Sequence, residues 1–87
     1  MISLTKWHVY MLECRDRSLY AGITNNIKKR FDEHKSGKGS RYVRSRKAKR
    51  VVYSESYRSK SKALRRECEI KRLTRQKKLA LLKKDIR

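Results

Sequence analysis

The chain has 87 residues and carries 27 Lys and Arg against 8 Asp and Glu, a formal net charge of +19. A hydrophobic fraction of 37% allows one small domain with a modest core, and it excludes a large buried cavity for a small-molecule organic cofactor. Because so large an excess of positive charge repels itself unless an anion neutralises it, we expect a nucleic acid as the partner.

Two other classes of protein are excluded by the same sequence. The longest apolar runs, residues 9–12 and 79–82, are far shorter than the roughly 20 residues that span a bilayer, so we expect no membrane partner. The N-terminus lacks the apolar segment of a signal peptide, and we therefore expect a cytoplasmic, nucleoid-associated protein. Cys14 and Cys68 have no metal-ligand spacing, and we interpret both as small buried hydrophobic residues without a disulfide.

The hydrophobic patterns predict three strands and three helices in the order β-β-α-β-α-α. The fold class is therefore α+β, a small three-stranded antiparallel sheet flanked by three helices. The predicted strands are residues 7–14, 19–24 and 51–57. All 87 residues are expected to form one domain, with a core at residues 7–73 and a basic C-terminal helix at residues 74–87.

Capping residues predict where the helices begin and end. Asn25 or Asn26 is expected to cap the first helix, whose apolar stripe includes Ile27, Phe31 and His34 and which ends near Gly37. Ser59 or Ser61 is expected to cap the second helix, which runs to about residue 73. Thr74 is expected to cap the third, which runs to about residue 83 and packs its leucines on the sheet.

The first hairpin determines whether two tyrosines meet. If Cys14 pairs with Ser18, Tyr10 faces Gly22 and Tyr20 projects from the same side of the sheet. Two phenols then converge beside a glycine, which leaves a notch where a phosphate can approach. A slip of one residue would separate the tyrosines. Aromatic residues in strands most often serve packing, and a phenol becomes a useful base only where cations lower its pKa.

Two basic residues on the first helix have the spacing of a phosphate grip. Arg30 lies one turn before His34, so the two side chains are neighbours. An Arg fork there would stabilise the charge that develops on a phosphate in its transition state. The alternative for Arg30 is a solvated basic face shared with Lys28 and Lys29, and the alternative for His34 is a polar residue at the edge of the stripe.

Glu67 is the acid whose position calls for a partner. Helical spacing puts it inside the apolar arc of Ala63 and Ile70, whereas Glu69 falls among arginines and is explained by a surface ion pair. A carboxylate on a packing face is costly unless it is paired or bound to a metal. Its partner is either Arg30 or a divalent cation.

Residues 38–50 are expected to form a cationic loop around Tyr42, which would serve as a stacking platform. Such a loop contacts the nucleic-acid backbone and reads little sequence. The residues predicted to bind nucleic acid are Gly22, Lys28, Lys29, Lys38, Arg41, Tyr42, Arg44, Arg46 and Lys71.

Several of these residues together resemble a known family. Tyr10, residues 20–22, Arg30, His34 and Glu67 are similar in order and spacing to the GIY-YIG nuclease domain over residues 7–73. The greatest similarity is to its small stand-alone bacterial members, and it lies in residues 18–24, 37–42 and 63–67.

The resemblance implies a mechanism with one divalent metal ion. Glu67 would hold a single Mg²⁺ or Mn²⁺, whose other ligands are water and phosphate. Tyr10 would orient or deprotonate the attacking water, Tyr20 would help position water or phosphate, Arg30 would stabilise the phosphorane, and His34 would assist proton transfer. Which tyrosine is the base stays open.

The implied activity is that of a metal-dependent endonuclease that hydrolyses phosphodiester bonds, with DNA favoured over RNA as the substrate and RNA left open. The family includes the cutting domain of a bacterial excision-repair nuclease, so DNA repair is an expected context. Selectivity would come from substrate structure, or from a separate targeting protein, and not from base sequence.

Two alternatives to an active nuclease stay open. The chain has His8 in place of the family's Gly, Ile23 where some members have Lys, and no clear Asn after Glu67. A catalytically weak or inactive nucleic-acid-binding module is therefore the first alternative. An RNA- or ribosome-associated structural protein is the second, and it is supported by charge and size alone.

Overall fold

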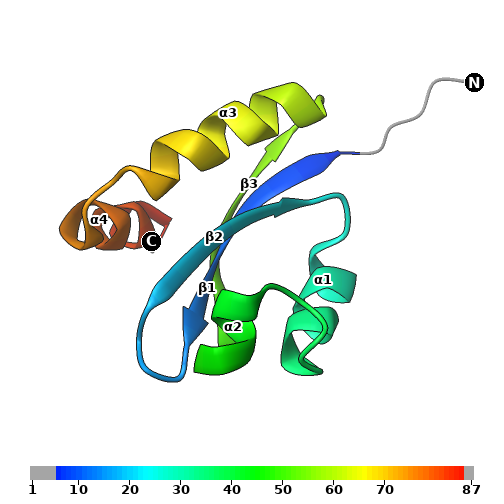
Figure 1. Ribbon diagram of the computed structural model, residues 1–87. Helices are drawn as coiled ribbons and strands as arrows, with labels where there is room; N and C mark the ends of the chain where they lie inside the picture. Colours follow the sequence, from blue (N-terminus) through cyan, green and yellow to red (C-terminus); the bar gives the residue numbers. More distant parts are fainter. Residues whose placement is uncertain (1–5, 86–87) are drawn as a thin grey trace, which may run out of the picture.

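The computed structural model describes residues 6–85, and side chains as far as residue 82. Three strands form one antiparallel sheet in the order β2-β1-β3 (Figure 1), which confirms the predicted fold class. The outer residues of the predicted domain and basic helix, 1–5 and 86–87, lie outside the described part. The elements are β1 (Trp7–Cys14), β2 (Leu19–Thr24), α1 (Ile27–Lys35), α2 (Arg41–Arg46), β3 (Ala48–Tyr57), α3 (Lys60–Lys71) and α4 (Arg75–Asp85).

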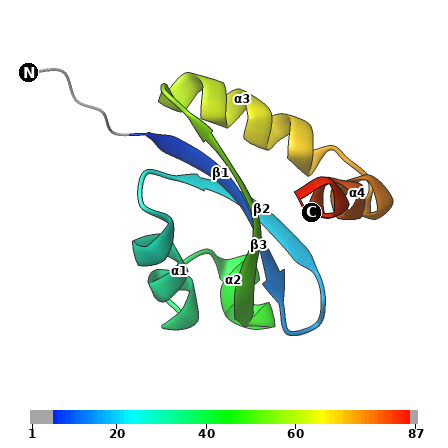
Figure 2. The ribbon, with the colours of Figure 1, turned by 180° about the vertical axis from the view of Figure 1, so that it is seen from behind.

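Helices cover both faces of the sheet. In Figures 1 and 2, α3 and α4 lie on one face, and α1 and α2 lie on the other. The central strand β1 alternates between the two layers, because successive side chains in a strand point to opposite faces. Its residues Val9 and Met11 pack with α3 residues, whereas Tyr10, Leu12 and Cys14 pack in the layer of α1 and α2.

The hairpin register is the one expected from the sequence. Tyr10 pairs with Gly22, and Leu12 pairs with Tyr20, in an antiparallel ladder. The turn is closed by the Cys14 amide, which donates to the Ser18 carbonyl at 2.9 Å. Because paired residues share a face, Tyr10 and Tyr20 lie on the same side of the sheet.

Side-chain caps settle which of the candidate residues begin the helices. The Asn26 side chain accepts from the Lys29 amide at 3.0 Å, and Ser59 accepts from the Lys62 amide at 3.3 Å. Thr74 caps α4 as predicted, because its hydroxyl accepts from the Lys77 amide at 3.2 Å. After α1, Gly37 adopts a φ of +85°, a conformation typical of glycine at a helix end.

The prediction of a cationic loop at residues 38–50 is wrong. Residues Arg41–Arg46 form a fourth helix, and β3 begins at Ala48 instead of residue 51. The Ser40 hydroxyl caps this helix by accepting from the Val43 amide at 3.2 Å, and the Val43 side chain is fully buried. A helix of six residues is too short to show a periodic pattern and depends on such a tertiary anchor.

Two predictions of burial also fail. Cys14 is buried, but Cys68 is exposed, and both are free thiols. The buried side of α3 carries Ala63 and Ile70, and Cys68 is turned well away from it. On α4, Leu81 and Leu82 pack against the core as expected, whereas Leu79 is exposed. Within residues 6–85, no helix has the length and apolar character to cross a bilayer.

Two described residues other than glycine have a positive φ, Arg17 at +69° in the turn after β1 and Lys47. Lys47, between α2 and β3, has a φ of +64°, which non-glycine residues rarely adopt. The Lys47 amide donates to the Val43 carbonyl, and the Lys47 carbonyl accepts from the Arg15 amide, so two backbone hydrogen bonds hold the residue in this conformation. We expect Lys47→Gly to stabilise the fold by about 1 kcal/mol, as measured by urea unfolding. Lys49→Gly, in the exposed part of β3, is the control and should destabilise, because it lacks a positive φ. Equal losses in both variants would contradict the assignment of strain.

Candidate active site

Tyr10 and Gly22 form the floor of the candidate site. The Tyr10 side chain is buried, and a Cβ atom built on Gly22 would lie 2.6 Å from the Tyr10 hydroxyl oxygen. Gly22 therefore leaves room for the phenol itself, which occupies the notch that the sequence analysis expected to be open to a phosphate.

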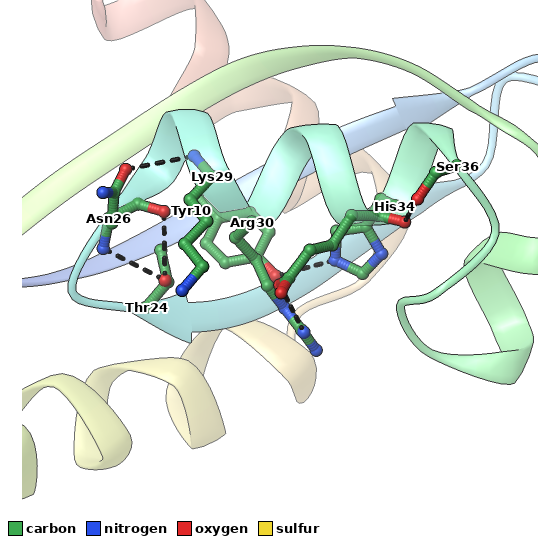
Figure 3. Close-up of polar contacts among 8 residues, drawn as sticks. Tyr10, Thr24, Asn26, Lys29, Arg30, His34 and Ser36 are labelled. Carbon is green, nitrogen blue, oxygen red and sulfur yellow. Dashed lines mark hydrogen bonds and ion pairs between the residues drawn. The ribbon is translucent and has the colours of Figure 1, made fainter.

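Tyr10 is joined to His34 by a buried hydrogen bond. The Tyr10 hydroxyl and His34 Nε2 lie 3.0 Å apart. Figure 3 shows this contact, and both residues are 2% exposed in the structure. Burial lowers the pKa of His34, and the positive charge of Arg30 lowers it further. His34 is therefore neutral at pH 7, and one ring nitrogen is free of a proton.

Arg30 lies beside this pair, on the side of α1 that faces the sheet (Figure 3). Its Nη1 donates to Glu33 Oε1 at 3.1 Å, and the side chain is 35% exposed. Burial raises the pKa of the Tyr10 phenol, and the charges of Tyr20 and Glu67 add to this shift, whereas the neighbouring Arg30 guanidinium opposes it. Tyr10 is therefore protonated at neutral pH, and Arg30 remains within reach of a substrate.

An aromatic row continues outward from His34. The Tyr20 ring meets His34 edge-on, with centroids 5.6 Å apart, and stacks on Tyr42 at 5.7 Å. The Arg46 guanidinium lies 4.6 Å from the Tyr42 ring centre and pairs with Asp16. Tyr42 is thus engaged by two neighbours, although it remains 39% exposed.

Glu67 approaches from the other layer. It belongs to α3, which packs on β1 and on the edge strand β2. The side chain is 15% exposed, and its carboxylate lies 3.6 Å from Lys71 Nζ. The alternative of a Glu67–Arg30 pair is not seen, because Arg30 pairs with Glu33. The negative charge of Glu67 adds a small contribution to the raised pKa of the Tyr10 phenol.

The structure therefore gathers Tyr10, Tyr20, Arg30 and His34 in one layer, whereas Glu67 belongs to α3 in the other layer. Of the residues predicted to bind nucleic acid, Gly22 is buried beneath Tyr10, and Lys71 pairs with Glu67. Lys71 is nevertheless exposed, as are the others, Lys28, Lys29, Lys38, Arg41, Tyr42, Arg44 and Arg46.

Two residues of the site were missed from the sequence. Glu33 holds the Arg30 guanidinium, and its spacing of three residues on one helix was a usable signal. Gly39 lies against the imidazole, since a Cβ atom there would come within 2.1 Å of His34 Nδ1. Gly39 could be found only from this contact in the folded protein, because no spacing in the sequence relates it to His34.

Comparison with known proteins now identifies the fold. The family model described as the GIY-YIG catalytic domain matches residues 6–80. The chain belongs to the GIY-YIG family. This confirms the resemblance read from the spacing of Tyr10, Tyr20, Arg30, His34 and Glu67.

The relatives of this GIY-YIG chain are bacterial UPF0213 proteins. One from Staphylococcus haemolyticus is 44% identical over 79 residues, which cover 91% of this chain and 96% of that protein. One from Cupriavidus necator is 50% identical over 74 residues, which cover 85% of this chain and 80% of that protein. These GIY-YIG relatives contain little besides the matched region.

Two solution NMR structures share the fold. The UPF0213 protein from Bacillus halodurans has a TM-score of 0.58 and 42% identity, and the match covers 90% of this chain and 83% of that one. A protein from E. faecalis has a TM-score of 0.63 and 32% identity, and the match covers 97% of this chain and 90% of that one. The GIY-YIG family is a family of nuclease domains, so a nucleic acid is the class of substrate that it suggests.

Gly22→Ala tests the contact between Tyr10 and the edge strand. The added methyl group would overlap a buried ring that has little room to move, so we expect a loss of about 1–3 kcal/mol in unfolding free energy. Denaturant unfolding measures the loss. In a Tyr10→Ala background the same change should cost much less, because the overlapping ring is absent. Equal costs in the two backgrounds would contradict the contact.

The lowered pKa of His34 predicts a dependence of stability on pH. The unfolded histidine takes up a proton near its ordinary pKa of 6.5, whereas the folded one does so only at lower pH. The contribution of neutral His34 to the free energy of unfolding is present above pH 6.5 and is lost as the pH falls from 6.5 toward the pKa of His34 in the folded protein. We expect His34→Gln to flatten the fall in unfolding free energy over this range. His8→Gln is the control, and equal slopes in both variants would contradict the prediction.

Proposed function

We propose that this protein is a metal-dependent endonuclease that hydrolyses DNA phosphodiester bonds and selects its substrate by structure rather than sequence. The single observation that carries the proposal is the buried hydrogen bond between Tyr10 and neutral His34, with the Arg30 guanidinium beside it. Burying the polar groups of Tyr10 and His34 is costly, and the partly exposed guanidinium beside them adds charge, so packing alone does not account for the arrangement.

The Tyr10–His34 bond supplies a path for a proton. Because burial keeps the phenol protonated, Tyr10 cannot begin as a free base. It can take a proton from the attacking water while it passes its own proton to His34 Nε2, which is 3.0 Å away. The proton then resides on the imidazole, and the new hydroxide bonds to phosphorus as the leaving oxygen departs. This route makes Tyr10 the base and leaves Tyr20 to orient His34 and the substrate.

Arg30 supplies charge stabilisation. Its side chain is partly exposed, so a phosphate can reach it, and Glu33 restricts its orientation beforehand. A guanidinium held in this way stabilises the extra negative charge of the pentavalent phosphorane more than that of the ground state.

The residues fit a single divalent ion. Among the side chains of residues 6–82, no three His, Cys, Asp or Glu are gathered as a metal-binding cluster. Glu67 offers one largely buried carboxylate, and the pairing with Lys71 at 3.6 Å is loose enough to exchange. Mg²⁺ or Mn²⁺ commonly binds through one or two carboxylates, substrate phosphate and water. Such an ion would neutralise charge on the leaving oxygen.

The exposed cations favour recognition of a nucleic-acid backbone. Lys28, Lys29, Lys38, Arg41 and Arg44 belong to the layer that contains Tyr10 and His34. Contacts of this kind position phosphates and carry no sequence information, so DNA structure or a separate targeting protein would decide where cutting occurs. Cutting of this kind would suit a role in DNA repair.

One observation favours the alternative of an inactive binding module. Tyr10 and His34 are each only 2% exposed, so water reaches the phenol only when the surface above it opens. Cleavage and binding therefore have to be measured separately.

The proposal is tested by incubating the protein with single-stranded, duplex and branched DNA in Mg²⁺ or Mn²⁺. We expect cleavage that requires the metal and is lost in Glu67→Gln and in Arg30→Ala. Tight binding without cleavage in either metal would favour the inactive module. Cleavage that persists unchanged in both variants would point to a contaminating nuclease and overturn the assignment.

A further inference from the structure

One cavity bordered by His34 plays no part in the mechanism proposed above. It has a volume of about 240 Å³ and forms where the end of α1, the end of α2 and the start of β3 meet. Its lining includes Arg15, Lys35, Arg44 and Lys47, together with His34, and no acidic side chain. The volume is below the roughly 300 Å³ at which pockets for drug-sized ligands begin, which suits a small anion better than a nucleoside.

The four cations of this cavity are not neutralised by the protein. Within the part of the chain that the structure describes, none of them forms an ion pair. The acids nearest in sequence are engaged elsewhere, because Asp16 pairs with Arg46 and Glu33 with Arg30. Like charges in a concave site repel one another until an anion enters.

The backbone at Lys47 is a second and independent observation. The residue holds a φ of +64°, at which glycine would be favoured. Residues held in such conformations cluster at active sites and ligand-binding sites. Here the strained residue is a lysine that lines the cavity.

His34 links this cavity to the candidate active site. It lines the cavity, while its Nε2 is bonded to Tyr10. Among the described residues, its Nδ1 is the one buried side-chain polar atom that has no hydrogen-bond partner. An anion in the cavity would therefore lie next to the imidazole that takes part in proton transfer.

We propose that this cavity binds a phosphate group, namely the terminal phosphate of a nucleic-acid strand. A terminal phosphate carries more charge than an internal phosphodiester, and it needs room for a chain on one side only. The identity of the strand rests on the proposed function, but phosphate binding itself does not.

Inorganic phosphate, titrated into isotope-labelled protein at constant ionic strength and without divalent metal, is the first probe. We expect the largest NMR shifts at residues 35–37 and 47–48 and at the His34 ring. In Arg15→Gln/Lys47→Gln, we expect the affinity to fall by about tenfold or more. The matched control, Lys62→Gln/Arg65→Gln, removes the same charge from α3, and we expect a change of less than about twofold. Shifts spread over the basic surface, or equal losses in both double variants, would overturn the site.

Lys47→Gly separates binding from folding. Because this change is expected to relieve strain, a weaker affinity for phosphate in a variant at least as stable as the wild type cannot come from unfolding. Unchanged affinity in both Lys47→Gly and Arg15→Gln would overturn the role of these side chains.

Oligonucleotides identify the source of the phosphate. Single strands of one sequence with a 5′-phosphate, a 3′-phosphate or only hydroxyl ends are compared by binding without metal. We expect one phosphorylated strand to bind about fivefold tighter than the hydroxyl strand, and we expect Arg15→Gln/Lys47→Gln to abolish the difference. Equal affinity of all three strands would overturn the assignment to a chain end. Neither measurement depends on cleavage, so a failure of the nuclease proposal would leave both results interpretable.

Discussion

Glu67→Gln is expected to lower the rate of metal-dependent cleavage by about a thousandfold or more, which corresponds to about 4 kcal/mol of transition-state stabilisation. The substitution keeps the size of a side chain that is 15% exposed, and it removes the negative charge that a divalent ion requires. Among the side chains that the structure describes, no three His, Cys, Asp or Glu residues are gathered as a metal-binding cluster, so the metal would depend chiefly on Glu67. Single-turnover cleavage at saturating protein measures the rate, and Mn²⁺ titration measures the affinity for the metal.

Glu69→Gln is the matched control on the same helix. Its side chain is 60% exposed and pairs with Arg66, so its loss removes only a surface ion pair. We expect a change in rate of no more than a few-fold. Equal effects of the two substitutions would mean that general charge, and not a metal site at Glu67, controls the activity.

Arg30→Ala is expected to reduce the cleavage rate by about 10²–10³-fold with only a modest change in affinity for DNA. The reason is that the guanidinium is fixed by Glu33 beside Tyr10, where it meets the charge that develops on phosphorus. One exposed cation among many contributes little to binding, so the loss should appear in the rate at saturation.

Two variants distinguish transition-state stabilisation by the Arg30 guanidinium from a general contribution of positive charge to DNA binding. Arg30→Lys keeps the charge but loses the planar fork, and we expect most of the defect to remain. Lys29→Ala removes an exposed neighbour and should weaken binding while the saturated rate stays close to wild type. Activity restored fully by lysine, or lost equally at residue 29, would contradict the role of the guanidinium.

Local patterns in the sequence predicted most of the fold and several contacts of the site. The alternation in residues 7–14 and the turn after Cys14 were enough for the register that pairs Tyr10 with Gly22. Helix spacing was enough to place Arg30 and His34 side by side, because residues three and four apart share a helix face. Asn26, Ser59 and Thr74 were among the predicted caps, since capping depends on neighbouring amides.

The remaining features depend on packing between distant segments. Helix α2 forms around the buried Val43, so the prediction of a loop there could not include it. The Cys68 thiol is exposed because α3 turns its Ala63–Ile70 side to the sheet. These outcomes depend on which side chains fill a shared volume, and sequence spacing does not contain that information.

The sequence by itself determined the three strands, the helices α1, α3 and α4, and the basic charge, and it predicted the hairpin register once Cys14 is paired with Ser18, because each follows from neighbours in the chain. Only the tertiary structure decided that Tyr10 fills the space above Gly22, that His34 is buried and neutral, and that Glu67 faces Lys71 instead of Arg30. Burial and partner choice are set by the close packing of two helical layers on one sheet, and these in turn set the protonation of the groups that we propose to be catalytic.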